Sequence, residues 1–135
     1  MAEGLFRKLA EGREHEFSVA SAGISAMDGF PATEETIRAM NDEGVDVSGH
    51  RSRRLSYDMI HSADQIYVME EIHRELILRI APEAEPKVLL LTEVAGQRER
   101  SGYNEIPDPI RMSSSFYRNV LSVIRDCVTK IVERS

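Results

Sequence analysis

Three kinds of side chain in this sequence could take part in chemistry: an acid, a thiol and a group of cations. Asp108 lies in the run Ile-Pro-Asp-Pro, where Pro109 fixes the backbone beside the carboxyl group. A carboxyl group held in place can protonate a departing alkoxide or amine and can later activate water. The alternative is that Asp-Pro is only a turn dipeptide. Asp108 is therefore the strongest single candidate for a catalytic residue.

Cys127 is the only cysteine, so it is the only thiol that could act as a nucleophile. It lies between Ile124 and Val128, on the apolar stripe of a predicted helix. A reactive thiolate needs an electropositive and partly exposed site, often at the start of a helix. We therefore predict a core role for Cys127. A single cysteine also excludes an internal disulfide and is typical of a reducing cytoplasm.

The one basic cluster consists of His50, Arg51, Arg53 and Arg54. These side chains could line the approach to a phosphate. The alternative, which we favour, is a solvated loop in which Arg53 is anchored to a carboxylate. No pair of histidines has the spacing of metal ligands. We therefore expect the histidines to be surface or structural residues: His15, His50, His61 and His73.

The first ten residues predict an amphipathic helix, because Leu5, Phe6 and Leu9 fall on one face. No N-cap and no strand precede this helix in the sequence. In α/β proteins, a helix that follows a strand often binds an anion at its N-terminus, where free N–H groups point outwards. We therefore expect this helix to be the second half of a strand–loop–helix unit whose first half lies outside the sequence.

Strands are expected at Phe17–Ala22, Gln65–Met69 and Lys87–Leu91, which are short and rich in apolar or β-branched residues. Helices are expected between them, with Thr33 and Ser56 as N-caps and Gly44 as a terminator. Strands that alternate with helices predict an α/β fold, a parallel sheet flanked by helices on both faces. The polar stretch Thr92–Ile106 predicts a mobile surface loop.

Two helices carry clear apolar patterns. The helix Glu70–Ile80 is expected to bury Ile72, Leu76, Ile77 and Ile80. The last helix is expected to begin at the N-caps offered by Ser113–Ser115 and to bury a long stripe at i, i+3, i+4 and i+7. That stripe consists of Val120, Leu121, Val123, Ile124, Cys127, Val128, Ile131 and Val132.

The composition limits the classes of function. The 135 residues are enough for one domain with one real core, and the apolar content of 41% is ordinary for a globular protein. The net charge of −6 argues against nucleic acid and against an anionic membrane surface as partners. No run of about 18 apolar residues is present, so no membrane span is predicted.

Taken in order, several segments resemble the low-molecular-weight protein-tyrosine-phosphatases, with the related arsenate reductases and bacterial protein-arginine phosphatases. The resemblance covers nearly the whole chain and rests on order and spacing. The segments are Met1–Phe6, Ser21–Gly23, Gly29 with Pro31 and Ala32, Gly44–Asp46, Ser48–Leu55, Ala63–Met69 with His73, and Ile106–Pro109. The resemblance implies that Asp108 is the general acid and then the general base of a cysteinyl-phosphate mechanism.

One part of the family pattern is not found. The family carries its nucleophile and its phosphate-binding arginine in a Cys-x5-Arg loop just ahead of the first helix, on a central first strand. This sequence contains no Cys-x5-Arg, so it offers no nucleophile, and we expect it to be inactive by that route. We expect a single phosphatase-like domain over residues 1–135, truncated at its N-terminus. The causes to separate are a start codon assigned at an internal methionine, a shortened chain, and real loss in a pseudo-enzyme.

The resemblance implies no metal or organic cofactor, and it implies a phosphorylated protein or a small phosphate ester as substrate. Ile110 stands where eukaryotic members usually carry an aromatic residue, which leaves phosphoarginine or arsenate chemistry open beside phosphotyrosine. A different class of function is a non-catalytic binding module. A missing central strand would leave unpaired backbone groups and favour a homodimer through the incomplete sheet.

Overall fold

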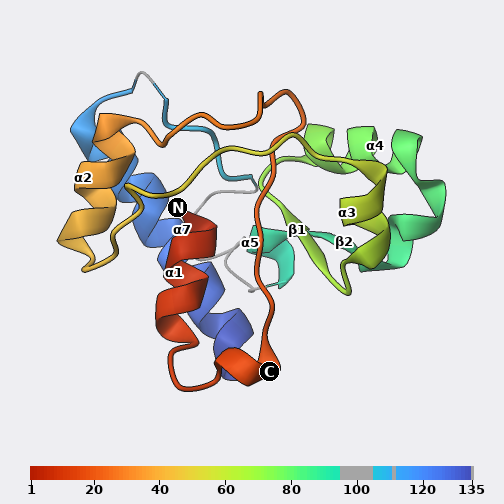
Figure 1. Cartoon of the computed structure of the whole chain (residues 1–135), viewed down its shortest axis with the longest axis horizontal. Coiled ribbons are helices and arrows are strands. Elements are labelled where there is room, and N and C mark those ends of the chain that lie inside the picture. Colours follow the sequence, from red (N-terminus) through yellow and green to blue (C-terminus); the bar gives the residue numbers. More distant parts are fainter. Residues whose placement is uncertain (95–104, 111, 135) are drawn as a thin grey trace.

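A computed structural model describes residues 1–94, 105–110 and 112–134 of the chain (Figure 1). Helices make up most of the secondary structure, and the two strands are short. The elements are α1 (Ala2–Leu9), η1 (Glu14–Glu16), α2 (Glu34–Asp42), α3 (Tyr57–Ser62), β1 (Ile66–Val68), α4 (Glu71–Ile80), η2 (Pro82–Lys87), β2 (Val88–Leu90), α5 (Leu91–Val94) and α7 (Ser114–Arg134). No described helix is both long and apolar enough to cross a membrane.

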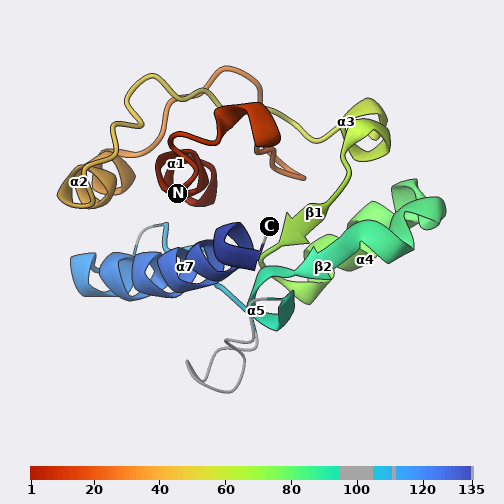
Figure 2. The ribbon, with the colours of Figure 1, turned by 90° about the horizontal axis from the view of Figure 1, so that it is seen from below.

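The two strands form a parallel pair in which Tyr67 lies opposite Leu89. They lie within the predicted segments Gln65–Met69 and Lys87–Leu91, and α4 and η2 make the crossover between them. Alternation along β1 sends Val68 into a cluster with α3 and α4, whereas Tyr67 packs against the cluster around α7. Helices therefore cover both faces of the sheet, and the predicted α/β class is confirmed (Figure 2).

The third predicted strand, Phe17–Ala22, is not a strand in the structure. The backbone there is extended, with φ −131° and ψ 137° at Phe17, but no ladder forms. The residue that follows the segment, Gly23, makes only an isolated parallel bridge with Arg54. The prediction was wrong because alternation favours an extended backbone, whereas a strand also requires a neighbouring strand to pair with.

The larger apolar core lies around α7. The predicted stripe is confirmed, except that Val123 is only half-buried, and α1 and α2 pack against it (Figure 2). Within α1, Leu5 is buried but Leu9 is exposed, and Ala10 is buried beyond the end of the helix. The buried residues of α7 are Tyr117, Val120, Leu121, Ile124, Cys127, Val128, Ile131 and Val132.

The smaller core lies between the sheet, α3 and α4, and it corrects the predicted inner face of α4. Ile77 is buried as expected and Leu76 is half-buried, but Ile72 and Ile80 are each 50% exposed. The helix turns a neighbouring face to β2, where the Arg74 guanidinium donates to the carbonyl of Val88 at 3.2 Å. Buried Ala81, which follows the helix, continues this face at i+7 from Arg74.

Local signals for helix ends are confirmed. Thr33 and Ser56 each accept a hydrogen bond from the backbone N–H three residues on, at 3.3 Å. Ser113 does the same for Phe116 at 3.2 Å. Gly44 follows α2 with φ +74°, a conformation that favours glycine. In the predicted loop Thr92–Ile106, Thr92 is instead buried within α5, and residues 95–104 lie outside the described part of the chain.

Candidate functional site

The segment that carries Asp108 is tied to the carboxyl end of β1. The Ile106 N–H donates to the carbonyl of Met69, directly after the strand, at 2.8 Å. The Glu71 N–H donates to the Glu105 carboxylate at 3.1 Å, and the Ile106 side chain is only 2% exposed. In parallel sheets, ligands bind outside the carboxyl ends of the strands. The segment is therefore fixed at the edge of the sheet where α/β proteins place their sites.

Asp108 itself is exposed, while the flanking Pro109 is buried. Its Oδ1 accepts a hydrogen bond from the Ile110 N–H at 3.0 Å, which closes a local turn. The proposed turn role and a chemical role are thus compatible, because one carboxylate oxygen holds the backbone. In the described part of the chain, the other oxygen has no hydrogen-bond partner.

The leading end of α1 lies over the same core as the Asp108 segment. Met1 and Ala2 pack against the apolar cluster that contains Ile106, and Met69 packs there as well. No side chain caps the helix, so its first backbone N–H groups are left for another partner. The shared cluster therefore joins a helix start and a strand end to Ile106, which lies two residues before Asp108.

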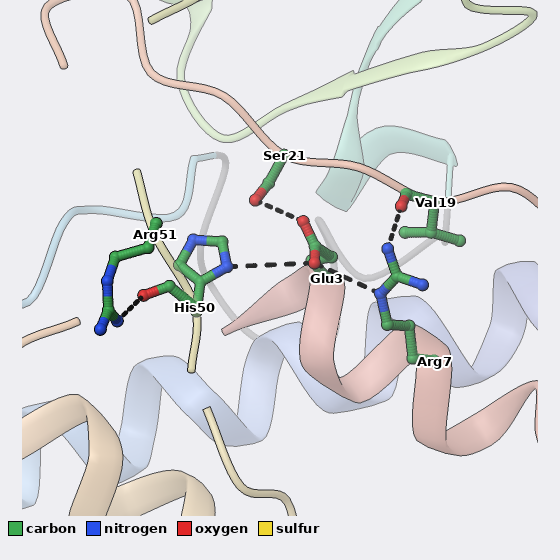
Figure 3. A network of polar contacts seen from close by, with 6 residues as sticks. All are labelled: Glu3, Arg7, Val19, Ser21, His50 and Arg51. Carbon is green, nitrogen blue, oxygen red and sulfur yellow. Dashed lines mark hydrogen bonds and ion pairs between the residues drawn. The ribbon is translucent and has the colours of Figure 1, made fainter. Parts of the chain in front are cut away.

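A polar network surrounds the first turn of α1 (Figure 3). Glu3 accepts hydrogen bonds from Ser21 Oγ at 2.8 Å and from Arg7 Nε at 3.3 Å. His50 Nδ1 lies 4.0 Å from the same carboxylate, and Arg7 also donates to the carbonyl of Val19. Burial opposes ionisation of Glu3, but the hydrogen bonds from Ser21 and Arg7 and the charges of Arg7 and His50 lower its pKa. The network therefore connects α1 to two distant loops.

Next to these segments, residues 23–31 and 50–55 are joined by a row of hydrogen bonds, and we call these two loops the two-loop platform. The Gly29 N–H donates to the Ser52 carbonyl at 2.9 Å, and the Ser52 N–H donates to the Phe30 carbonyl at 2.7 Å. The Ser52 hydroxyl bridges to the Met27 carbonyl, and the Arg54 N–H donates to the Asp28 carboxylate at 2.8 Å. These contacts hold two segments of loop as one surface.

The basic cluster lies on this platform. The Arg51 guanidinium donates to the carbonyls of Ser48 at 3.1 Å and His50 at 2.8 Å. Arg53 and Arg54 are exposed. Among the residues that the structure describes, no carboxylate lies within ion-pair distance of Arg53, so the expected anchor is not found there.

Cys127 is fully buried, with 0% of its surface exposed, and burial raises the pKa of its thiol to about 11. A thiol in this environment is protonated at neutral pH and out of reach of a substrate. The predicted core role is therefore confirmed.

Sequence reasoning did not identify Glu3 and Ser21 as a pair. One feature of the sequence could have drawn attention to Glu3: it is an acid in the first turn of a predicted helix. A hollow of about 280 Å³ was not predicted either. It lies between α2 and α7, where Asp42 pairs with Arg118 at 3.4 Å and Glu43 pairs with Arg125 at 2.7 Å. Across the described ranges, no group of three His, Cys, Asp or Glu side chains converges as a metal site would require.

The fold defines a class: an α/β protein in which the start of α1 and the segment before an exposed carboxylate pack on one apolar core, and that segment is bonded to the carboxyl end of a parallel strand. A sequence profile described as "Low molecular weight phosphotyrosine protein phosphatase" matches residues 1–134. The chain belongs to this family.

Relatives and solved structures agree with the profile. The probable low molecular weight protein-tyrosine-phosphatase AmsI of Erwinia amylovora is 33% identical over 117 residues, which cover 87% of this chain and 77% of the relative. The corresponding probable phosphatase EpsP of Ralstonia solanacearum is 31% identical over 134 residues, covering 99% of this chain and 85% of the relative.

Among solved structures, Vibrio vulnificus Wzb in complex with benzylphosphonate is 31% identical and aligns with a TM-score of 0.85, over 99% of this chain and 88% of its own. A mutant of the arginine phosphatase YwlE with a phosphorylated active-site serine is 25% identical, with a TM-score of 0.87 over 98% of this chain and 84% of its own.

Proposed function

We propose that this chain carries the acid–base half of a phosphatase that hydrolyses phosphate monoesters through a cysteinyl-phosphate. Asp108 would protonate the leaving group as the phosphorus–oxygen bond breaks, and its carboxylate would then activate the water that attacks the phosphocysteine. The observation that carries this proposal is the 2.8 Å hydrogen bond between Ile106 N–H and the Met69 carbonyl, which holds the exposed acid at the carboxyl end of a parallel strand.

The nucleophile has to come from outside these residues. The sequence contains no Cys-x5-Arg, and Glu133 stands at the sixth position after Cys127. Cys127 is buried with a pKa raised to about 11. We therefore propose that residues 1–135 form one phosphatase-like domain that is inactive by this route without an added thiolate and arginine. The proposed mechanism uses no metal or organic cofactor and suits a reducing cytoplasm, where a thiolate persists.

Turnover of p-nitrophenyl phosphate tests both the proposed role of Asp108 and the proposed absence of a nucleophile. The chain as it stands is expected to show no turnover, and activity that survives Cys127→Ser would overturn the mechanism. A fusion that adds a first strand and a Cys-x5-Arg loop of the family's pattern ahead of Met1 is expected to gain activity. In that fusion, Asp108→Asn is expected to lower kcat about 10²–10⁴-fold, the usual contribution of a general acid. Asp64→Asn, which changes an exposed aspartate before β1, is the matched control.

The identity of the leaving group is a separate question. Ile110, directly beyond Asp108 and Pro109, is 51% exposed and aliphatic. The likeness to an arginine phosphatase supports phosphoarginine as an alternative to phosphotyrosine, and arsenate chemistry is a third possibility within the fold. Comparison of kcat/KM for the two phosphorylated residues in one peptide sequence would rank them, and Ile110→Tyr is expected to favour phosphotyrosine.

A second candidate function is self-association through the sheet. β1 pairs with β2 along one edge, and within the described residues no backbone hydrogen bond reaches its other edge. An open strand edge accepts a strand from another chain. This proposal predicts a homodimer whose mass by light scattering rises with concentration. A clean monomer at high concentration would contradict it.

A further inference from the structure

Two groups of arginines can be distinguished among the described residues. Most of those in or beside the helices lie within 4 Å of a carboxylate, which is expected in a chain with 23 acidic and 17 basic residues. The paired ones are Arg7, Arg13, Arg38, Arg74, Arg118 and Arg125. Arg51, Arg53 and Arg54 are exposed, and none of them has an ion-pair partner in the part of the chain that the structure describes. They form a local excess of positive charge on a protein of net charge −6.

The surface that carries these arginines is held in a defined shape. Four backbone hydrogen bonds of 2.7–2.9 Å join the two loops of the platform, and the Ser52 side chain adds two contacts across it. Ordering of a binding surface before its partner arrives lowers the entropic cost of association. The arginines therefore lie on a surface that is already ordered. Arginines on a chain terminus or a long loop would have to be ordered when the partner binds.

Exposed apolar side chains lie on the same platform. Phe30 is 56% exposed and Met27 is 69% exposed, and both belong to the loop that is hydrogen-bonded to Ser52. Aromatic residues, methionine and arginine are the residue types that are enriched in protein–protein interfaces. A polypeptide with acidic and apolar side chains would find both kinds of contact here, and guanidinium groups bind carboxylates with well-defined geometry.

The platform also adjoins the candidate site. His50, which begins the second loop, has its Nδ1 atom 4.0 Å from the Glu3 carboxylate in the first turn of α1 (Figure 3). A chain that lay along the platform would therefore pass close to the start of α1.

We propose that the two-loop platform is a docking surface for an acidic segment of a protein substrate, next to the phosphorylated residue. This inference rests on the proposed phosphatase function, because it names the class of substrate that the same site would receive. Attraction to Arg53 and Arg54 is local, whereas the rest of the acidic surface repels such a segment. An acidic substrate segment is therefore expected to approach the protein from the side of the platform.

Binding of short fluorescein-labelled peptides to the chain, followed by anisotropy, tests the proposal without turnover. The probes are an acidic peptide with one phosphotyrosine, the same acidic peptide with tyrosine, and a lysine-rich peptide with phosphotyrosine. The variant is Arg53→Glu/Arg54→Glu, because the Arg51 side chain also holds loop carbonyls. The control is Arg79→Glu, which reverses an exposed arginine on α4 that has no ion-pair partner among the described residues. Circular dichroism checks that each variant is folded.

Both acidic peptides are expected to bind, with a Kd that the double variant raises about tenfold and that added salt also raises. Arg79→Glu is expected to change the Kd less than twofold. Equal binding of the acidic and lysine-rich peptides, or equal losses in the double variant and the control, would overturn the docking proposal. Stronger binding of a single-stranded oligonucleotide of equal charge would also overturn it. If the charge preference persists but the fusion with the added loop shows no turnover of p-nitrophenyl phosphate, the phosphatase proposal fails and the platform remains a binding surface for acidic peptides.

Discussion

The two longest helices in the described part of the chain, α7 and α4, carry similar apolar patterns but stand in different surroundings. α7 is covered along one whole face, because α1, α2 and α5 pack against it. α4 rests on a two-stranded sheet and on η2, and it buries Ile77 while Ile72 and Ile80 stay half exposed. An apolar stripe therefore identifies residues that share a face, and the amount of neighbouring structure decides whether that face is covered.

The largest expected difference is in the free energy of unfolding when one isoleucine on each of these helices is shortened. Ile124→Ala on α7 removes a buried side chain and is expected to lower the free energy of unfolding by about 2–5 kcal/mol. Ile80→Ala on α4 removes a half-exposed side chain and is expected to cost less than about 1 kcal/mol. Urea unfolding followed by circular dichroism measures both. Equal losses would mean that the exposed face of α4 is covered in solution.

Substitution and labelling of Cys127 test whether water and reagents reach the core around α7. Cys127→Ser places a hydroxyl among apolar neighbours and is expected to cost about 1–3 kcal/mol. Because burial raises the thiol pKa to about 11, the folded chain holds almost no thiolate at pH 8. Iodoacetamide is therefore expected to label the native protein only after denaturant is added, as followed by mass spectrometry. Fast labelling of the native chain would show that α7 separates from its neighbours.

The start of α7 gives a smaller effect. Ser113 accepts the Phe116 N–H at 3.2 Å, so Ser113→Ala is expected to cost about 1 kcal/mol. The neighbouring Ser114 is exposed and makes no such contact in the described structure, which makes Ser114→Ala the matched control. Thermal unfolding compares the two variants. A loss at Ser114 as large as that at Ser113 would remove the capping explanation.

Glu3 should show the smallest effect, and it depends on pH. Hydrogen bonds and nearby cations lower the pKa of Glu3 in the folded chain, although burial opposes them. The resulting stability is therefore complete above about pH 4.3, the ordinary pKa of a glutamate, and is lost as the pH falls through the lower folded value. Glu3→Gln is expected to show a flatter loss of melting temperature between pH 5 and pH 3.

The matched control is Glu34→Gln, which alters an exposed carboxylate of α2 that pairs with Arg38 at 3.4 Å. That pair is strongly exposed, so little stability is expected from it at any pH. Identical acid profiles for the wild type and Glu3→Gln would show that the network around α1 contributes nothing measurable to stability.

Features with short-range causes could be predicted from the sequence. Thr33, Ser56 and Ser113 cap helices because their hydroxyls reach an N–H three residues on, and Gly44 ends α2 for a backbone reason that is equally local. The stripe of α7 follows from helical periodicity. The centres of β1 and β2 follow from short apolar runs.

Features that depend on distant segments could not be predicted. Whether Phe17–Ala22 becomes a strand depends on a neighbour that pairs with it, and the face of α4 that is covered depends on the sheet. Ser21 and Glu3 meet although 18 residues separate them, and Arg54 meets Asp28 across 26 residues. Asp108 was predicted from the dipeptide Asp-Pro and from the family resemblance, and its chemical role stays a prediction.

The backbone hydrogen bond between Ile106 and Met69 fixes the start of the Asp108 segment next to β1. The position of Asp108 is therefore expected not to depend on the number of residues between β1 and Ile106. Because the anchor lies only two residues before Asp108, insertions or deletions within residues 95–104 change the connection to α5 and leave the carboxylate in register with the strand. One added residue between Ile106 and Asp108 would instead displace the carboxylate by about 3.5 Å. The spacing between Ile106 and Asp108 is therefore expected to matter more for the position of the acid than the number of residues that connect it to α5.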